Sequence, residues 1–411
     1  MIRAFAVIYF LAFFNIALYG QQLGFSLTEN VKRAQIPIEI HNNLIVLPVV
    51  INNQLPLKFI LDTGVRTTIL TEKSFSDILN LPYSRSYSIS GPGGEKIIEA
   101  FVTNNVSIDL PGITGKGHAM LVLEEDYLEL RNYMGTDVHG VLGYELFSRF
   151  VIQIDYRNNR IVLTQPDKFK AGRRYAEFPL TIEDTKPYML AKIQMNDSSI
   201  VNAKLLVDSG ASHGLMIDPE SDPNLTPPTQ HIESIIGRGL GGVITGKIGR
   251  IKSLELGKYT LDDVIANFPD PNSYTDTLKL DRNIFRNGSI GGEVLSRFNV
   301  VINLPGEKIY LKKNSSYKKK FYYNLSGITI KAKGARLRSY EITNVRANSS
   351  AERGDLKNGD IIISVNGISA AGLSLTILNG FFNSKPGRKV SMELERGGVK
   401  IKRIIRLEDQ I

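Results

Sequence analysis

Short apolar runs with period-two alternation, separated by turns, dominate the chain from about Gln35 to Leu311. Alternation of this kind is typical of β-strands that bury one face, and few stretches are long enough for an amphipathic helix. The pattern therefore predicts a mostly β body. Two short helices are expected at residues 144–150 and 292–298, where each follows an apolar-apolar-glycine turn.

The β pattern occurs twice along the chain. Residues 36–40 correspond to residues 178–182, and residues 140–150 correspond to residues 288–298. Strand-like stretches follow the second landmark in both copies. A break with proline, glycine and a basic cluster lies between the copies at about residues 165–174. Correspondence at this long period indicates a duplicated unit.

Each copy also contains an apolar run that ends in a short polar motif. The first motif is Asp-Thr-Gly at Asp62, and the second is Asp-Ser-Gly at Asp208. The glycine of the apolar-apolar-glycine turn follows the aspartate by 81 residues in the first copy and by 83 in the second. A glycine cluster begins 29 residues after each aspartate, at Gly91 and at Gly237. One such triplet is weak evidence, but two in register are strong.

The first twenty residues differ from the rest. An apolar run begins after Arg3 and ends at Tyr19, and the small residue Gly20 follows. A short apolar run after a positive charge is typical of a secretory signal peptide, and this run is short for a membrane span. We expect residues 1–20 to be removed on export, with an uncleaved membrane anchor as the alternative.

Composition is consistent with an exported globular protein. The 411 residues are 42% hydrophobic and 22% charged, and no later stretch approaches the length of a membrane span. The absence of cysteine excludes disulfides and thiol catalysis, so stability must come from burial in large domains. The net charge of +9 includes a basic run at residues 312–320. Because that run lies between two recognisable units, we interpret it as a solvated linker and expect no nucleic-acid binding.

The sequence pattern changes at about Asn324. Residues 356–367 contain an Asn-Gly-Asp turn, a buried apolar strand and a second Asn-Gly turn. This run resembles the Leu-x-x-Gly-Asp-x-Ile-x-x-Val-Asn-Gly motif of PDZ domains. The resemblance implies a groove helix at residues 373–382 and closing strands at residues 390–394 and 400–407. It also implies a carboxylate-binding loop made of Leu325, Ser326, Gly327 and Ile328.

Each polar triplet combines three useful groups. Aspartate supplies a carboxylate, the next residue supplies a hydroxyl that can bond between facing loops, and glycine permits the tight turn that lets the loops meet. Together with the flanking repeats, the arrangement over residues 36–311 resembles the retropepsin-like aspartic proteases, in a single-chain tandem form like that of pepsins. The resemblance implies two β-barrel lobes that face each other across a pseudo-twofold axis.

The resemblance also implies a role for each residue of the paired triplets. Asp62 and Asp208 would share one proton, because two like charges so close do not both ionise, and the ionised partner would activate a water. No metal or cofactor is required. The residues that would fix the two loops are Thr63, Gly64, Ser209 and Gly210. Candidate flap tips, with plain hairpin turns as the alternative, are Gly91, Gly93, Gly94, Gly239, Gly241 and Gly242.

Three further features of the sequence bear on this interpretation. The first triplet is followed by Val65 and a bulky cation, Arg66, which could be held by a nearby carboxylate or could lie along the cleft and lower the pKa of the pair. His139 and His213 lack the partner spacing of a metal site or a Ser/His/Asp arrangement, so we interpret them as surface or packing residues. Ser209 lacks the glycine that precedes the serine of a nucleophile elbow.

We therefore expect a mostly β fold with two acid-protease β-barrel lobes and a small α+β PDZ domain. The expected divisions are residues 1–20 (signal peptide), 21–35 (linker), 36–165 (lobe 1), 175–313 (lobe 2) and 324–411 (PDZ domain). The expected function is that of a secreted or periplasmic bacterial aspartic endopeptidase that acts on a peptide or unfolded protein. Its PDZ domain would capture a peptide C-terminus by strand addition, or would gate the cleft. A non-catalytic peptide-binding module of the cell envelope is the alternative.

Overall fold

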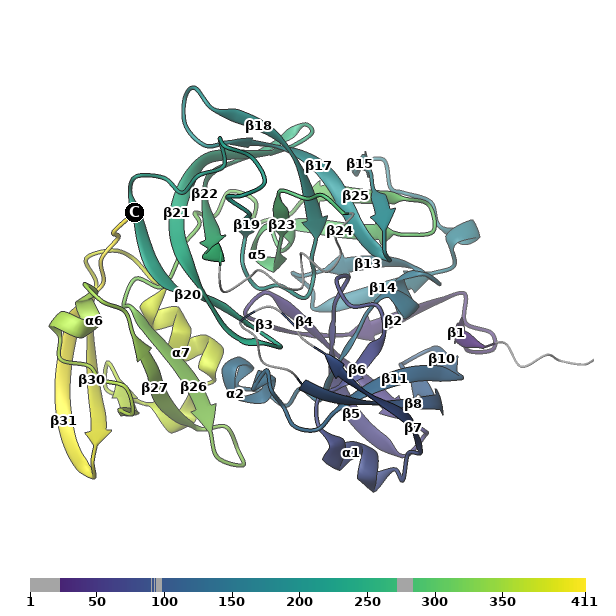
Figure 1. Ribbon diagram of the computed structural model, residues 1–411, viewed down its shortest axis with the longest axis horizontal. Coiled ribbons are helices and arrows are strands. Elements are labelled where there is room, and N and C mark those ends of the chain that lie inside the picture. The colour runs from purple at the N-terminus through teal and green to yellow at the C-terminus, as the bar shows by residue number, and fades with distance from the viewer. Residues whose placement is uncertain (1–22, 90, 92, 94–97, 272–283) are drawn as a thin grey trace, which may run out of the picture.

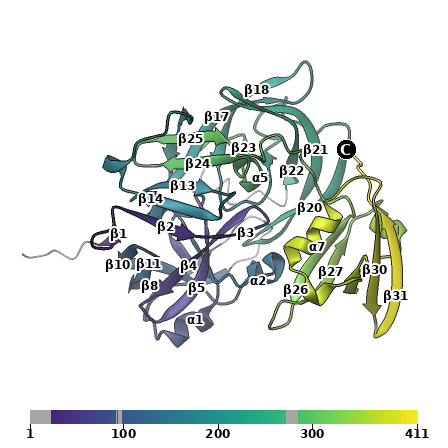
Figure 2. The same ribbon diagram turned by 180° about the vertical axis from the view of Figure 1, so that it is seen from behind.

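The computed structural model describes residues 23–89, 91, 93, 98–271 and 284–411. Strands dominate this part of the chain, which confirms the predicted mostly β class, and they form two lobes with a smaller domain beside them (Figures 1 and 2). The expected signal peptide at residues 1–20 lies outside the described residues. Within them, no helix combines the length and apolar character needed to cross a membrane.

Lobe 1 is built on a nine-stranded sheet with the order β3-β4-β5-β12-β6-β11-β8-β7, and β9 pairs with β4 off this path. Its strands are β3 (Glu39–His41), β4 (Leu44–Ile51), β5 (Leu55–Leu61), β6 (Thr68–Leu70), β7 (Tyr83–Ile89), β8 (Ile98–Val106), β9 (Ile108–Asp109), β11 (His118–Leu123) and β12 (Gly140–Leu142). Three short helices flank it: α1 (Lys73–Ile78), α2 (Leu130–Met134) and α3 (Tyr144–Phe147).

Lobe 2 repeats this plan in an eight-stranded sheet with the order β16-β17-β18-β23-β19-β22-β21-β20. Its elements are β16 (Thr181–Glu183), β17 (Lys186–Gln194), β18 (Ile200–Val207), β19 (Leu215–Ile217), β20 (His231–Gly239), β21 (Gly242–Leu256), β22 (Tyr259–Pro269), β23 (Gly288–Ile290) and α5 (Gly292–Leu295). In each lobe the strand that leads to the aspartate pairs in parallel with the strand that leads to the apolar-apolar-glycine turn, β5 with β12 and β18 with β23.

A third sheet joins the lobes. It has six strands in the order β15-β25-β24-β13-β14-β2, and its centre is the antiparallel pairing of β13 from lobe 1 with β24 from lobe 2. Its elements are β2 (Arg33–Pro37), β13 (Val151–Asp155), β14 (Arg160–Thr164), β15 (Ala176–Pro179), β24 (Phe298–Asn303) and β25 (Lys308–Lys313), with a 3-10 turn, η1, at Pro166–Lys168. The lobes are therefore joined by a continuous hydrogen-bonded sheet as well as by the chain.

The segment expected as a linker, residues 21–35, contains structure that the sequence did not predict. Strand β1 (Gly24–Leu27) pairs with β10 (Ile113–Lys116), and β2 begins at Arg33. The side chain of Phe25 is only 2% exposed. Burial of this aromatic ring fixes the segment to lobe 1. The mostly polar composition of the segment gives no sign of this contact.

The smaller domain contains the sheet β26-β27-β28-β30-β31, with β29 paired to β28. Its elements are β26 (Ile328–Lys333), β27 (Ser339–Val345), β28 (Ile361–Val365), β29 (Ile368–Ser369), β30 (Lys389–Arg396), β31 (Val399–Arg406), α6 (Ser350–Arg353), α7 (Leu375–Phe382) and the 3-10 turn η2 (Ala370–Gly372). Strand β26 is the end strand of the sheet among the described residues. On α7, Leu378 and Phe382 are fully buried against the sheet.

The two predicted short helices exist as α3 and α5, each one turn long, whereas α1 and α2 were not predicted. Helix α2 has five residues and no side-chain cap at its start. Neither its length nor a capping residue therefore predicts it from the sequence. It is held by tertiary contacts that are described below.

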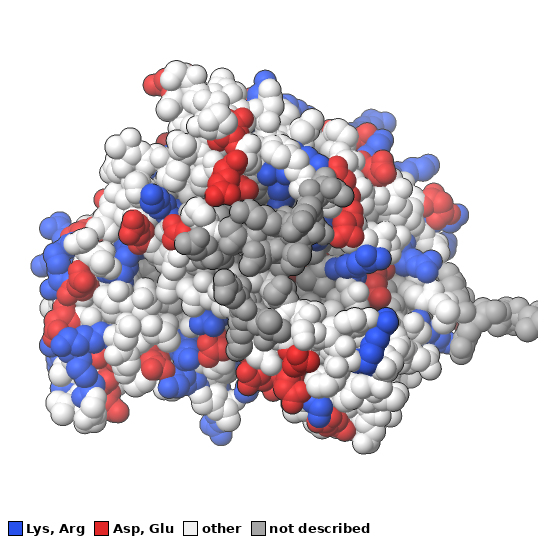
Figure 3. Space-filling model, viewed as in Figure 1, with Lys and Arg blue, Asp and Glu red and all other residues white. Residues whose placement is uncertain are grey.

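Charges on the face shown in Figure 3 are mixed: basic and acidic side chains are interspersed over the strands of the small domain at the left of that view. Ion pairs account for part of this arrangement, since Asp355 contacts both Arg396 and Arg403. The net positive charge of the chain therefore does not form one basic surface on this face.

Candidate active site

The two aspartates occupy equivalent positions at the ends of buried strands. Asp62 directly follows β5, and its N–H donates to the carbonyl oxygen of Leu142 at 2.9 Å. Asp208 directly follows β18, and its N–H donates to the carbonyl oxygen of Ile290 at 2.9 Å. The duplicated sequence therefore produces the same backbone geometry twice, with each aspartate anchored to the apolar-apolar-glycine turn of its own lobe.

The residue after each aspartate ties the two lobes together. Thr63 N–H donates to Ser209 Oγ at 3.1 Å, and Ser209 N–H donates to Thr63 Oγ1 at 3.0 Å. Each hydroxyl also donates to the opposite strand, Thr63 to Val207 O at 2.6 Å and Ser209 to Leu61 O at 2.8 Å. Both side chains are almost completely buried, at 1% and 0% exposure. These four reciprocal bonds fix the separation of the two loops.

The glycine of each triplet leaves room for the carboxylates to meet. Gly64 N–H donates to Asp62 Oδ1 at 2.6 Å, and Gly210 N–H donates to Asp208 Oδ1 at 3.0 Å. A Cβ atom at Gly64 would lie 3.1 Å from Asp62 Oδ1 and 3.8 Å from Asp208 Oδ1. A Cβ atom at Gly210 would overlap the carboxylate of Asp62. Both carboxylates therefore occupy one small space, and no larger residue fits at Gly210.

The environment of the pair favours the retention of a proton. Burial, together with the negative charge of Asp208, raises the pKa of Asp62 to about 7, against the weaker lowering effect of the Gly64 N–H and the charge of Lys186. Burial also raises the pKa of Asp208. The largest opposing effect on Asp208 is the positive charge of Arg286, which favours its ionised form. Both pKa values are raised, so the pair retains a proton between its two carboxyl groups.

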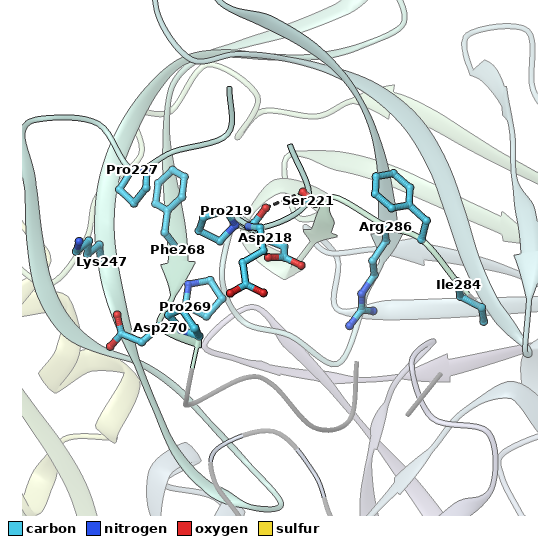
Figure 4. Close-up of a pocket in the computed structure, with 13 residues that line it drawn as sticks. Asp218, Pro219, Ser221, Pro227, Lys247, Phe268, Pro269, Asp270, Ile284 and Arg286 are labelled. Carbon is cyan, nitrogen blue, oxygen red and sulfur yellow. Dashed lines mark hydrogen bonds between the residues drawn. The ribbon is translucent and has the colours of Figure 1, made fainter. Parts of the chain in front are cut away.

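Arg286 belongs to a pocket on the lobe 2 side of the molecule (Figure 4). This cavity has a volume of about 470 Å³. Asp218, Asp270 and Lys247 also line it, along with apolar residues such as Phe268. In Figure 4 Arg286 lies across the pocket from Asp218. No sequence pattern points to Arg286, because it lies far from both triplets and in no motif.

Arg66 lies outside the space between the carboxylates. Its side chain is 71% exposed, and its Nη1 lies 3.6 Å from Asp184 Oδ1 of lobe 2. Asp184 in turn lies 4.0 Å from Lys186. Of the two possibilities raised by the sequence, Arg66 therefore takes the one in which a nearby carboxylate holds it. The departure after the first triplet leaves the geometry of the pair intact.

Two hairpin tips meet at the glycine clusters. In lobe 1, Gly91 and Gly93 lie between β7 and β8, and in lobe 2 the hairpin of β20 and β21 turns at Leu240 and Gly241. A Cβ atom at Gly91 would lie 2.6 Å from Leu240 Cβ. Gly93 contacts the backbone of Gly242 so closely that a Cβ atom there would overlap the Gly242 carbonyl. Each lobe thus carries a long hairpin, and the two tips are in contact.

Of the remaining flap candidates, Gly239 is the last residue of β20 and pairs with Gly242. Gly94 lies outside the described residues.

Comparison with known families supports this geometry. A family profile described as aspartyl protease matches residues 47–146 and again residues 191–294, and a profile described as PDZ domain matches residues 319–395. The chain consists of two aspartyl protease segments in tandem, followed by a PDZ domain. Among curated proteins, no relative matches it. The two matched protease segments each contain one aspartate of the pair, and the predicted family and fold class are confirmed.

Two histidines in the aspartyl protease segments, His139 and His213, have structural partners. His139 Nδ1 accepts from the Lys58 N–H at 3.1 Å, and at the equivalent position in lobe 2 Asn287 Oδ1 accepts from the Lys204 N–H at 2.9 Å. His213 Nε2 lies 3.0 Å from Ser289 Oγ, and burial lowers the pKa of its ring to about 4. These contacts support their interpretation as packing residues.

The loop of the PDZ domain that the sequence suggested for carboxylate binding has its donors occupied. Asn324 Oδ1 accepts from the N–H groups of Ser326 and Gly327, each at 3.1 Å, and Ser326 Oγ accepts from the Ile328 N–H at 3.3 Å. The side chain of Asn324 therefore takes the place that a peptide carboxylate would need. Leu325 is buried behind this loop, at 1% exposure.

Proposed function

We propose that this chain is an aspartic endopeptidase that hydrolyses peptide bonds with Asp62, Asp208 and a water held between them. The observation that carries the proposal is the meeting of two carboxylates in one space, fixed by the four reciprocal bonds of Thr63 and Ser209. A pair in this geometry shares one proton, since two carboxyl groups in one small space do not both ionise.

The roles of the two aspartates follow from the shared proton. Burial raises the pKa of both carboxyl groups, so the pair holds one proton in acidic to neutral solution, and the charge of Arg286 opposes protonation of Asp208. The ionised member of the pair acts as the base that takes a proton from the water, while that water attacks the carbonyl carbon of the substrate. The protonated member donates a hydrogen bond to the developing oxyanion, and a proton then passes to the leaving nitrogen.

The two hairpins support an extended peptide as the substrate. Their tips meet at Gly91 with Leu240 and at Gly93 with Gly242. Closure over a bound peptide would exclude water and offer backbone groups for pairing with its main chain. Because substrate must pass beneath the tips, the hairpins must also open.

Export is part of the proposal. It rests on the apolar run that ends at Tyr19 and on the absence of cysteine. We place the enzyme in the periplasm or outside a bacterial cell, where it would meet peptides or unfolded proteins, with its PDZ domain as a second peptide-binding surface. The alternative of a non-catalytic module drew on Arg66, whose position beside Asp184 removes that reason.

Cleavage of a peptide library by the purified protein tests the proposal. We expect cleavage at acidic to neutral pH, inhibition by a pepstatin-type compound, and loss of at least about 10³-fold in kcat for Asp208→Asn and Asp62→Asn. Asp218→Asn is the matched control, because it changes the same side chain in lobe 2 outside the pair. Equal cleavage by the wild type and Asp208→Asn would refute the assignment.

A further inference from the structure

Helix α2 of lobe 1 lies against the end strand of the PDZ domain. Asn132 Nδ2 donates to the carbonyl oxygen of Ala332 on β26 at 2.8 Å, and Arg131 Nη2 donates to the carbonyl oxygen of Ala335 at 2.9 Å. A Cβ atom at Gly135 would lie 2.5 Å from Leu375 Cβ, at the start of α7. In both ribbon views α2 is on the side of β26 away from β27 (Figures 1 and 2).

This is the edge at which a PDZ domain would receive a peptide. Strand β26 directly follows the loop at Leu325–Ile328 and is the end strand of its sheet among the described residues. Peptides that bind by strand addition form main-chain hydrogen bonds with such an edge. Since Asn132 already uses the carbonyl oxygen of Ala332, an added strand and α2 compete for the same part of β26.

The same segment of lobe 1 also holds the hairpin of lobe 2. Glu129, which directly precedes α2, lies 3.0 Å from Lys331 Nζ on β26 and 3.5 Å from Arg238 Nη2 on β20. Arg238 also donates to the hydroxyl of Tyr133 at 3.2 Å, and its guanidinium lies 4.9 Å from the ring centroid. Glu129 has a left-handed backbone with φ of 49°, a conformation that costs energy and that its neighbours maintain.

A second contact joins the PDZ domain to the base of this hairpin. Arg250 on β21 lies 3.3 Å from Asp409 Oδ2 and donates to the carbonyl oxygens of Ile411 at 3.3 Å and Phe321 at 3.4 Å. The PDZ domain is therefore fastened directly to the base of the hairpin. Near the tip, Glu129 and Tyr133 of α2 link it to the hairpin.

We propose that the PDZ domain is a clamp on the lobe 2 hairpin, and that a peptide strand added to β26 opens this hairpin by displacing Glu129 and α2. The clamp holds the tip closed, because Arg238 lies only two residues before Leu240, which contacts Gly91. Glu129, Lys331 and Arg238 are each between 23% and 33% exposed, so water can replace their ion pairs and release is reversible. The effect of the clamp on peptide cleavage rests on the function proposed above.

Amide hydrogen exchange on the full chain tests the clamp without requiring catalysis. Lys331→Met removes the anchor of Glu129 on β26, and Asn132→Asp places a carboxylate against the carbonyl oxygen of Ala332. We expect exchange of residues 236–243 to be at least about three-fold faster in both variants, because the hairpin opens more often. Lys333→Met is the matched control, since Lys333 lies on the same strand but pairs with Glu341 inside the PDZ domain.

A mixture of random decapeptides tests the effect of a ligand that adds to β26 as a strand. On the wild-type chain we expect slower exchange of residues 328–333 together with faster exchange of residues 236–243. Unchanged exchange of the hairpin in both variants would overturn the clamp, and protection of β26 without any effect on the hairpin, or no effect of the mixture at all, would overturn its control by a ligand.

Kinetics distinguish failure of the clamp from failure of the proposed function. If the chain is a peptidase, kcat/KM for a peptide substrate should rise in Lys331→Met and not in Lys333→Met. Faster hairpin exchange in a chain that cleaves nothing would retain the clamp and refute the peptidase. Cleavage of the peptide substrate with identical exchange and kinetics in all variants would retain the peptidase and refute the clamp.

Discussion

Two residues far apart in sequence, Asp62 and Arg286, set the charge state of the candidate site. Burial and the charge of Asp208 raise the pKa of Asp62, whereas the charge of Arg286 opposes the rise in the pKa of Asp208. The backbone bonds of the pair are duplicated in the two lobes. Arg286 therefore contributes an asymmetry that comes from outside the repeated motif.

Arg286→Gln should shift the pH dependence of activity. Arg286 lowers the pKa of Asp208, so its loss raises that pKa, and ionised Asp208 becomes available only at higher pH. The acidic limb of the profile of kcat/KM against pH should move upward. Lys247→Gln removes another cation from the same pocket and serves as the control. Identical acidic limbs for the wild type and Arg286→Gln would contradict the role of Arg286.

The pair should also affect stability in a defined pH window. The pKa of Asp62 rises from an ordinary 3.8 to about 7 on folding, so between these values the folded chain holds a proton that the unfolded chain has released. The free energy of unfolding should therefore fall as pH rises from about 4 to 7, by at most about 1.4 kcal/mol per pH unit. Asp62→Asn should reduce this slope in denaturant unfolding measured across the window, since Asp208 remains buried with a raised pKa. Parallel curves would show that the carboxyl group does not cause it.

At the scale of single elements, short loops and hairpins determine the geometry. The loops that carry Thr63 and Ser209 join the lobes through buried hydrogen bonds, and the two hairpins meet through glycines. In both cases small side chains allow backbone segments from different lobes to approach. Substitutions at these positions should therefore change the geometry between lobes while leaving each lobe's fold intact.

Ser209→Ala should destabilise the joined lobes. The change leaves the Thr63 N–H and the Leu61 carbonyl without the partners that Ser209 supplies, and both lie at a buried contact. At about 1–3 kcal/mol for each of these two unsatisfied buried groups, we expect a loss of roughly 2–6 kcal/mol in the free energy of unfolding. Ser198→Ala, at an exposed position, is the control for chemical denaturation. A loss below about 0.5 kcal/mol would mean that the bonds of Ser209 contribute little.

Gly93→Ala should keep the hairpin tips apart. Gly93 has φ of 105°, and a Cβ atom there would overlap the Gly242 carbonyl. We expect kcat/KM for peptide cleavage to fall roughly ten-fold because closure over the substrate is impaired. Gly237→Ala is the matched control, since the nearest atom to its Cβ position, Ile244 Cδ1, is 3.8 Å away. Equal losses in the two variants would argue against a role for the contact between tips.

For the whole molecule, the sequence predicts the individual domains better than the contacts between them. The triplets and the PDZ motif are local patterns of a dozen residues or fewer, and the repeat is the recurrence of such patterns at matched spacings, so the two aspartyl protease segments and the PDZ domain could be predicted. The partner of Arg66 could not, because Asp184 lies more than a hundred residues away and no periodicity connects them. Helix α2 is too short for a pattern, and its position on β26 depends on three domains at once.

The sheet shared by the lobes has a consequence for how the molecule can be divided. Its centre is the pairing of β13 with β24, in which Gln153 lies opposite Val301. Cleavage of the backbone at residues 170–174 would leave that ladder and the bonds of Thr63 and Ser209 untouched. Two fragments should therefore remain associated as a nicked heterodimer and co-elute in size-exclusion chromatography. A single half would expose the edge of its half-sheet, so an ancestor with one lobe would have needed to assemble with a copy of itself.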